Sequence, residues 1–108
     1  MAESFVYITC ESPRQAEEIG AALVEQRLAA CANILPGMRS VYRWQGKVER
    51  AEETVLIAKT RDDLVARLTD AVKSMHSYEV PCVVAVPITG GNPDFLDWIR
   101  TEASGADR

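Results

Sequence analysis

The stretch from residue 31 to residue 59 restricts the possible folds of this chain more than any other. Residues 31–35, CANIL, and residues 54–59, TVLIAK, are short and largely apolar, and a Gln45-Gly46 turn lies between them. Such runs bounded by turn residues indicate two antiparallel strands joined as a hairpin. The second run predicts an inner strand, and Pro36-Gly37 is expected to interrupt the first strand.

The tip of this hairpin extends beyond what the sheet of a 108-residue domain needs. Its alternating pattern places Arg39, Val41 and Arg43 on one face and Ser40, Tyr42 and Trp44 on the other. An overhanging arm with exposed aromatic residues is an aggregation hazard unless a partner covers it. We therefore predict an oligomer built by strand addition, in which Tyr42 and Trp44 pack between subunits.

A strand and a helix precede the hairpin. Residues 5–9, FVYIT, form a β-rich run. Ser12 and Gln15 have the spacing of a helix capping box, and Pro13 fits the first helical position. Apolar or small residues then recur at helical spacing, at Ala16, Ile19, Gly20, Leu23 and Leu28. This pattern predicts an amphipathic helix that lies on a sheet.

A second helix and a last long strand follow the hairpin. Thr60 and Asp63 repeat the capping spacing and predict a helix that ends at His76. Residues 80–88 carry no charge and are rich in β-branched side chains, which predicts an inner strand. Proline has no N–H to donate, so Pro87 is expected at the end of that strand or at its solvent-facing edge.

The end of the chain predicts a short third helix. Asn92 can cap it, Pro93 fits its first position, and its apolar stripe consists of Phe95, Trp98 and Ile99. Residues 101–108 are expected to fray.

The predicted order of elements defines the fold class. Strand, helix, strand, strand, helix and strand, followed by the extra C-terminal helix, predict an α+β protein with a ferredoxin-like βαββαβ sandwich. The long hairpin joins its second and third strands, and both main helices cover one face of an antiparallel sheet. Residues 1–108 are expected to form one domain, because a chain of this length can bury a sufficient core.

Composition excludes several classes of function. The net charge of −4 argues against binding to a nucleic acid backbone, and no apolar run approaches the roughly 20 residues of a membrane span. The N-terminus lacks a basic segment followed by an apolar core, so we expect a cytosolic protein. Three cysteines without a C-x-x-C pair predict neither a disulfide framework nor a structural zinc site.

The loop that contains His76, Tyr78 and Glu79 is the first candidate site, because it places these three polar side chains before the last strand. His76 can complement the negative end of its helix without binding anything. It can also act as a neutral ligand, with Glu79 as the nearest acid in sequence. Cys82 follows within the apolar run, and it is inert if it faces the core.

Catalysis has two possible sources in this sequence, and neither is favoured. Small ferredoxin-like acylphosphatases hold phosphate in a glycine-rich loop after the first strand. Here that loop is residues 10–14, CESPR, and Glu11 opposes an anion. A cysteine and a histidine can form a nucleophile pair, but Cys10, Cys31 and Cys82 lie in no recognisable nucleophile turn. We therefore expect no enzyme activity.

Four blocks of sequence carry a family resemblance. They are RLAACANILPGMRSVYRWQGKVE at residues 27–49, LIAKT at 56–60, HSYEVP at 76–81 and PITGGNPDFLDWI at 87–99. In these blocks the chain resembles the CutA divalent-cation tolerance proteins. The resemblance implies a ferredoxin-like subunit in a tight cytosolic homotrimer held by long hairpin strands. It also implies a role in tolerance of copper and other divalent metals, with no cofactor required.

The resemblance also implies a set of metal ligands. Carried over to this chain, these are Cys10, His76 and Cys82, with Glu79 nearby. Ser77 replaces the usual proline of the family's motif, and Cys82 replaces its usual acid. A thiolate at Cys82 favours softer ions such as Cu(I).

The outline of the family's trimer, which is similar to that of the PII proteins, implies an alternative function. In it, clefts between subunits bind a small anionic ligand, and the chain acts as a signalling module. The candidate residues for such a cleft or interface are Arg39, Tyr42, Arg43, Trp44, Lys47, Lys59 and Tyr78. The basic residues can equally pair in solvent with Glu49, Glu52 and Glu53.

Overall fold

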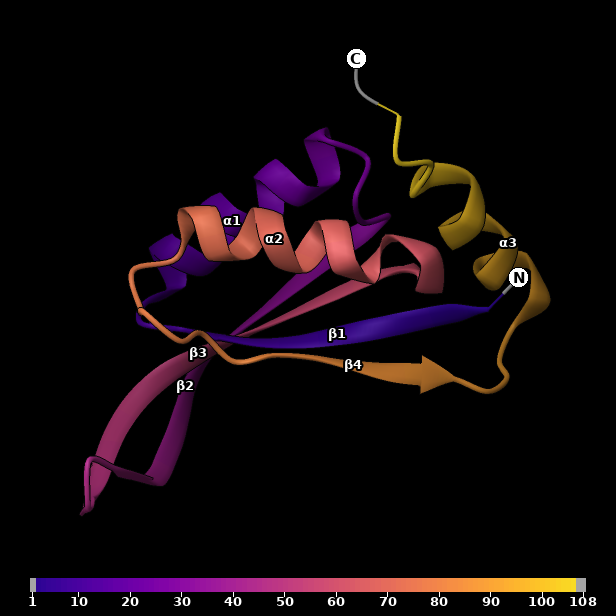
Figure 1. The fold of residues 1–108 in the computed structure, drawn as a ribbon. Coiled ribbons are helices and arrows are strands. Elements are labelled where there is room, and N and C mark those ends of the chain that lie inside the picture. The colour runs from indigo at the N-terminus through magenta and orange to yellow at the C-terminus, as the bar shows by residue number, and fades with distance from the viewer. Residues whose placement is uncertain (1, 107–108) are drawn as a thin grey trace.

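The computed structural model describes residues 2–106. Its elements are β1 (Glu3–Cys10), α1 (Pro13–Glu25), β2 (Cys31–Trp44), β3 (Lys47–Arg61), a 3₁₀ turn (Asp62–Leu64), α2 (Val65–Met75), β4 (Val83–Ile88) and α3 (Pro93–Glu102). The four strands form one sheet in the order β2-β3-β1-β4, and every neighbouring pair is antiparallel (Figure 1). This is the predicted ferredoxin-like α+β architecture, with its long hairpin and its extra C-terminal helix.

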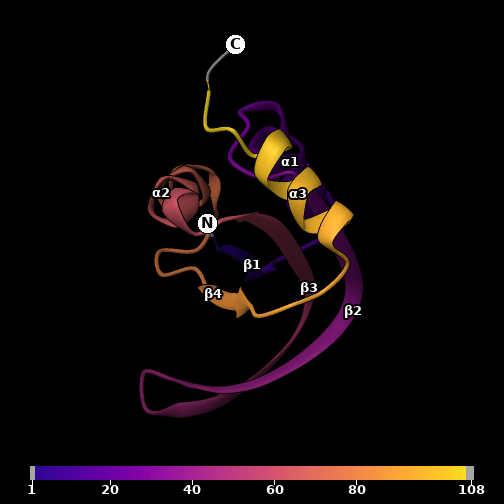
Figure 2. The ribbon, with the colours of Figure 1, turned by 90° about the vertical axis from the view of Figure 1, so that its right-hand side faces the viewer.

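One face of the sheet lies against the helices. Helices α1 and α2 lie side by side on this face, and α3 lies on the same side of the sheet, where it contacts β3 and β1 (Figure 1 and Figure 2). The core between the layers contains the fully buried apolar side chains Val6, Ile8, Leu23, Leu56, Leu68 and Val72. At Gly20 of α1, an added Cβ would lie 3.0 Å from the Cβ of Ala32. Glycine therefore lets this helix approach the sheet closely.

The first helix begins as its sequence predicts. Pro13 occupies its first turn, and the Ser12 hydroxyl accepts a hydrogen bond from the Gln15 N–H at 3.1 Å. The Gln15 side chain does not return to Ser12 as a capping box requires. Its oxygen accepts from the Glu11 N–H at 2.9 Å. The bond from Gln15 to Ser12 satisfies an N–H of the first helical turn that would otherwise lack a partner, and the bond from Glu11 to Gln15 holds the residue before the cap.

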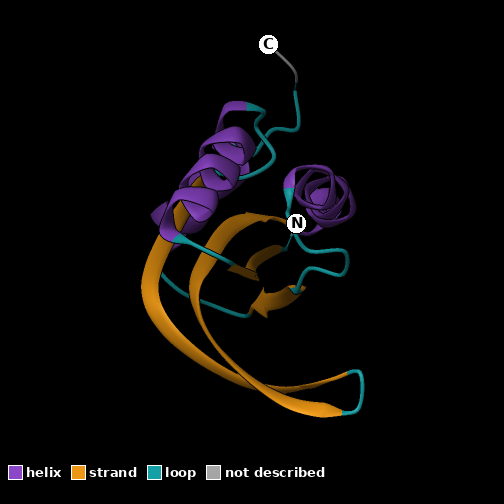
Figure 3. Cartoon of the chain, turned by 90° about the vertical axis from the view of Figure 1, so that its left-hand side faces the viewer, coloured by secondary structure: helices purple, strands orange, loops and turns teal. Residues whose placement is uncertain are grey.

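The hairpin is more regular than the sequence indicates. Strand β2 runs through Pro36 and Gly37 as one element, with a register shift between Leu35 and Met38 that absorbs them. At its tip Gln45 and Gly46 both have positive φ, at 50° and 81°. A two-residue turn in which both residues have positive φ fits the twist of the two antiparallel strands that it joins. The arm curves away from the body of the molecule (Figure 3).

The prediction that Thr60 caps the second helix is wrong. Its side chain is fully buried, and its hydroxyl donates at 2.7 Å to the backbone carbonyl of Leu28. Asp63 instead forms an ion pair with Arg61. A single 3₁₀ turn leads into α2, which starts without a side-chain cap. Strand β3 thus extends to Arg61, beyond the predicted residue 59.

The last strand is shorter than predicted and lies elsewhere in the sheet. It begins at Val83, and Val80 is 70% exposed in the preceding loop. Within the chain β4 is an edge strand, whereas an inner strand was predicted. Pro87 pairs with Ser4 in this edge strand, where its lack of an N–H donor is tolerated.

The end of the chain is more ordered than predicted. Thr101 and Glu102 belong to α3, and Ala103 is fully buried. The Gly105 N–H donates at 2.9 Å to the carbonyl of Arg27. Fraying is therefore contradicted up to this point, and residues 107 and 108 lie outside the described range.

Candidate functional site

A cavity of about 660 Å³ lies at the root of the hairpin. Strand β1 ends beside it, the hairpin forms one wall, and the loop between α2 and β4 forms another. Its lining residues are Thr9, Arg39, Ser40, Val41, Tyr42, Trp44, Glu53, Tyr78, Glu79, Val80 and Cys82. Most of the residues that the sequence singled out therefore gather in one place.

Glu53 is the central polar group of this cavity, and sequence reasoning misplaced it. The sequence suggested it only as one of three acids that can pair in solvent with basic residues, but it is only 9% exposed. One carboxylate oxygen accepts from the Tyr78 hydroxyl at 2.8 Å, and the other accepts from the Ser40 hydroxyl at 2.7 Å. Its position along β3 carried a usable signal, since residues 53, 55 and 57 share one face of the strand, and Val55 and Ile57 face away from the helices.

Burial and the charge of Glu53 shift the pKa of groups around the cavity. The pKa of Tyr78 is raised, first by burial and then by its hydrogen bond to Glu53. Burial also raises the pKa of Cys82. The pKa of Cys10, which is buried behind the cavity, rises to about 11, through burial and then the charges of Glu53 and Glu11. The thiol of Cys10 is therefore protonated at neutral pH.

Both ring nitrogens of His76 are already occupied. Nε2 lies 2.8 Å from the carbonyl oxygen of Thr9, and Nδ1 accepts from the Tyr78 N–H at 3.0 Å. Because Nδ1 accepts, the proton of the neutral ring lies on Nε2, which donates to Thr9. The ring also packs on Tyr78, with centroids 4.7 Å apart. His76 thus ties the loop to the end of β1.

The expected metal ligands do not form a ready-made site within the described chain. No three His, Cys, Asp or Glu side chains among residues 2–106 come together in an arrangement that could hold a metal ion. Neither ring nitrogen of His76 has a free lone pair in this conformation. Cys10 is buried, and its thiol is protonated at neutral pH. Cys82 and Glu79 line the cavity and are the two expected ligands that remain available.

The basic candidates do not share one cleft within the chain. Arg39 borders the cavity, while Arg43 and Lys47 lie near the tip of the hairpin. Lys59 lies on the body of the sheet, where its ammonium group donates to the side-chain oxygen of Asn33. It borders a separate pocket of about 470 Å³ beside the Gly90-Gly91 loop.

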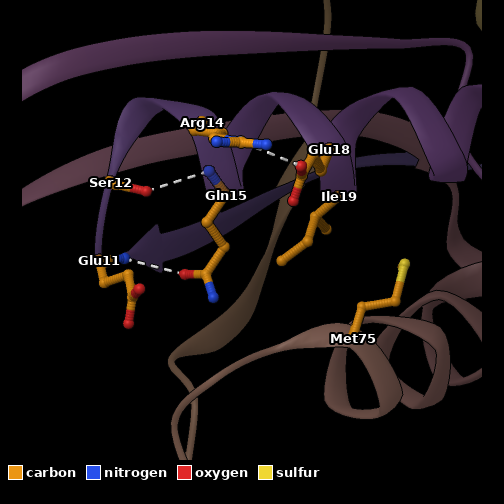
Figure 4. Close-up of a pocket in the computed structure, with 7 residues that line it drawn as sticks. All are labelled: Glu11, Ser12, Arg14, Gln15, Glu18, Ile19 and Met75. Carbon is orange, nitrogen blue, oxygen red and sulfur yellow. Dashed lines mark hydrogen bonds and ion pairs between the residues drawn. The ribbon is translucent and has the colours of Figure 1, made fainter.

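A second pocket, of about 430 Å³, tests the phosphate-loop alternative (Figure 4). The N–H of Glu11 is bonded to Gln15, and Arg14 forms an ion pair with Glu18. The Ser77 hydroxyl, from the loop before β4, donates to the Glu11 carboxylate at 2.6 Å. An N–H and a guanidinium that could hold phosphate already have partners, and two carboxylates border the space.

These features define a class of protein. The chain has a ferredoxin-like fold with an overhanging β2-β3 hairpin and a polar cavity at the root of that hairpin. The family model described as "CutA1 divalent ion tolerance protein" matches residues 4–102. The chain therefore belongs to the CutA1 family, as the resemblance in its sequence motifs predicted.

Individual relatives agree with this assignment. The divalent-cation tolerance protein CutA of Thermus thermophilus is 49% identical over 98 residues, which cover 91% of this chain and 95% of the relative. The mouse protein CutA is 45% identical over 97 residues, or 90% of this chain, but the match spans only 55% of the mouse protein. A chloroplastic CutA of Arabidopsis thaliana is 44% identical over 95 residues, covering 88% of this chain and 52% of that relative.

Solved structures share the whole architecture. The T. thermophilus protein superposes with a TM-score of 0.91 at 48% identity, covering 93% of this chain and 97% of that one. The periplasmic divalent cation tolerance protein CutA of Archaeoglobus fulgidus gives a TM-score of 0.90 at 46% identity, covering 94% and 98%. Over residues 2–106, no helix is long and apolar enough to cross a membrane.

Proposed function

We propose that this chain acts as a homotrimer in divalent-cation tolerance, binds copper or another divalent cation weakly, and catalyses no reaction. The role in tolerance comes from family membership and from the relatives that carry this description. The observation that carries the assembly is an apolar sheet face that the helices leave uncovered.

This open face is the side of the sheet opposite α1 and α2. Strand pairing places the side chains of Tyr7 and Val84 on it together, and likewise those of Phe5 and Val86. Leu35, on β2, joins them and is 51% exposed, while Val84 is 52% exposed. An apolar surface that crosses three strands favours contact with another subunit over contact with water.

The sheet also has two edges available for strand addition. Strand β2 lies at one edge and β4 at the other, so a β2 edge can pair with the β4 edge of the next copy. Such a head-to-tail contact closes into a ring when its rotation allows, and three copies make a trimer. Light scattering behind a sizing column tests this directly, and a monomeric mass would refute the assembly.

Cys82 and Glu79 are the proposed ligands for a weakly bound cation. Both line the cavity, and a thiol beside a carboxylate favours copper over magnesium or calcium. Binding has to displace a proton from Cys82, whose pKa is raised by burial. Calorimetry with Cu(II) and Zn(II) should show weaker binding in Cys82→Ser, whereas His76→Ala should lose little affinity. Equal affinity of the wild type and Cys82→Ser would contradict this assignment.

A sensor of a small anionic ligand is the second candidate, since Arg39 borders the same cavity. The Glu53 carboxylate within the cavity opposes it. Binding of inorganic phosphate that is lost in Arg39→Gln would favour this candidate over the first. A screen with acyl phosphate and ester substrates tests the absence of catalysis, and clear turnover would refute it.

The cytoplasm is the proposed location. All three cysteines are free thiols, as is usual in a reducing compartment. Among the relatives, two are described as chloroplastic and one as periplasmic, so location varies within the family. Fractionation of cells that produce the tagged chain is the test, and recovery outside the cytoplasmic fraction would refute this location.

A further inference from the structure

Aromatic side chains border much of the cavity at the root of the hairpin. Tyr42 and Trp44 line it from the hairpin, and Tyr78 lines it from the loop before β4. Pairing of Ser40 with Ala51 and of Tyr42 with Glu49 places the hydroxyl and aromatic side chains on one face of the arm. The faces of aromatic rings carry partial negative charge and attract ammonium groups within about 6 Å.

A buried carboxylate completes this arrangement. Glu53 is 9% exposed, and its two oxygens each accept one hydrogen bond from a neutral hydroxyl. A carboxylate offers about four acceptor positions, so about two remain for a ligand. Because the hydroxyls carry no charge, the negative charge of Glu53 is not cancelled by these partners.

The surrounding groups respond to that negative charge. It contributes to the raised pKa of Tyr78, of Cys82 and of Cys10, in each case together with burial. Glu79 adds a second carboxylate at the cavity. The cavity is therefore favourable to a positively charged guest.

Among residues 2–106, Arg39 is the one basic residue that borders the cavity. Along β2 it alternates with Ser40, so its side chain leaves the strand on the opposite face from that of Tyr42. It also borders a separate pocket on the arm, together with Arg50 and Glu52. In the pairing of β2 with β3, Arg39 lies directly opposite the acidic residue Glu52.

We propose that this cavity binds a small organic monocation of the alkylammonium class. The ammonium group meets the carboxylate of Glu53, and the rings of Tyr42, Trp44 and Tyr78 surround its alkyl part. A volume of about 660 Å³ is in the range of small-molecule sites. Because Tyr42 and Trp44 are also predicted to pack between subunits, the inference requires that the proposed trimer leaves this cavity open; it does not rest on binding of a divalent cation.

Fluorescence of Trp44 provides the test. The sequence has two tryptophans, and Trp98→Phe leaves Trp44 as the only indole. This variant of the full chain is titrated with n-butylammonium chloride and with tetramethylammonium chloride, against sodium chloride at equal ionic strength. We expect a saturable fluorescence change with the ammonium salts and none with sodium. An identical response to all three salts would overturn the proposal.

The matched pair of variants is Glu53→Gln and Glu52→Gln, which remove neighbouring carboxylates on opposite faces of β3. Loss of the carboxylate at position 53 should weaken ammonium binding by about tenfold or more, as expected for a charged hydrogen bond. Glu52→Gln should bind as the parent does. Equal affinity in the two variants would remove Glu53 from the site and refute the proposal.

A third variant covers the case in which Glu53→Gln fails to fold, which circular dichroism detects. This variant is Trp44→Leu. Trp44 is exposed on the hairpin arm, so its replacement should leave the fold intact. Calorimetry with n-butylammonium should show about a fivefold loss of affinity. Unchanged affinity there would refute the aromatic part of the site. Saturable binding of acetate in place of ammonium would overturn the proposal in favour of an anion site.

Discussion

The two faces of the sheet differ in what covers them. On the helix side, alternate residues of β1 such as Val6 and Ile8 are fully buried by the chain's own helices. On the open side, Val84 and Val86 are 52% and 39% exposed, although they are equally apolar. The covered face stabilises the fold of the chain itself, and the open face is the proposed contact with a second copy. The difference therefore separates residues that should govern folding from residues that should govern assembly.

The largest effect is expected from a charge on the open face. Val84→Glu places a carboxylate in the proposed interface, where burial without a partner is costly, so assembly should be lost. Light scattering behind a sizing column measures the mass. The matched control is Val24→Glu on α1, where the side chain is already 38% exposed and the assembly should persist. A full-size assembly in Val84→Glu would show that this face carries no interface.

Two substitutions that shorten an apolar side chain, one on each face of the sheet, test the same contrast. Ile8→Ala on the covered face should lower the free energy of unfolding by about 2 to 5 kcal/mol, through lost burial and the cavity left behind. Urea denaturation measures this, and the loss should not depend on protein concentration.

Val86→Ala on the open face is the matched comparison. Its cost should grow with protein concentration, because its proposed partner comes from another subunit. A cost for Val86→Ala that is the same at all concentrations would contradict the distinction between the two faces.

Alkaline pH should lower the free energy of unfolding through Cys10, which is buried on the covered face. The thiol of Cys10 has a pKa of about 11 in the folded chain against an ordinary value of 9.0. Because the folded value is higher, its contribution is fully present below pH 9 and is lost as the pH rises through about 11. The free energy of unfolding should fall by up to about 2 to 3 kcal/mol over this range.

The control for this titration is Cys10→Ser, which has a similar size and no group that ionises there. Urea denaturation at pH 8.5 and at pH 11 should show a smaller difference in Cys10→Ser than in the parent. Tyr78, whose pKa is also raised, contributes a loss in the same direction to both proteins. Identical differences would mean that Cys10 does not cause the effect.

The smallest effect is expected in the helix layer. Ser12→Ala removes the oxygen that accepts from the Gln15 N–H and should cost about 1 kcal/mol of stability. Ser74→Ala, near the end of α2, removes a hydroxyl that caps no helix start and should change stability by less than about 0.5 kcal/mol. Thermal unfolding of both variants measures the difference. Equal shifts in Tm would show that Ser12 does not stabilise the helix as a cap.

Local signals were sufficient to predict most of the fold. Turn residues at Gln45-Gly46 and the cap at Ser12 act through their immediate neighbours, and both appear in the structure as predicted. The prediction that Thr60 caps a helix was wrong because its hydroxyl donates instead to the carbonyl of Leu28, which is 32 residues away. The position of β4 at the edge of the sheet was missed because an apolar strand can be covered by its own chain or by another.

The candidate site was less accessible to sequence reasoning. Proximity in sequence placed Tyr78 and Glu79 together correctly. Glu53 was missed because a carboxylate is usually solvated, and only the folded hairpin brings it to Tyr78 and Ser40. The role of His76 depends on the backbone carbonyl of Thr9, 67 residues away, and no local pattern records such a bond.

The central position of β1 has a consequence for folding during synthesis. Its two neighbours in the sheet are β3 and β4, and the partner of Glu3 in β4 is Ile88. One edge of the first strand made therefore has no native partner until most of the chain has left the ribosome. The hairpin of β2 and β3 can close earlier, since its strands are joined by two residues. Pairing of β1 with β4 should be a late step, and until it occurs the exposed edge of β1 needs protection from other nascent chains.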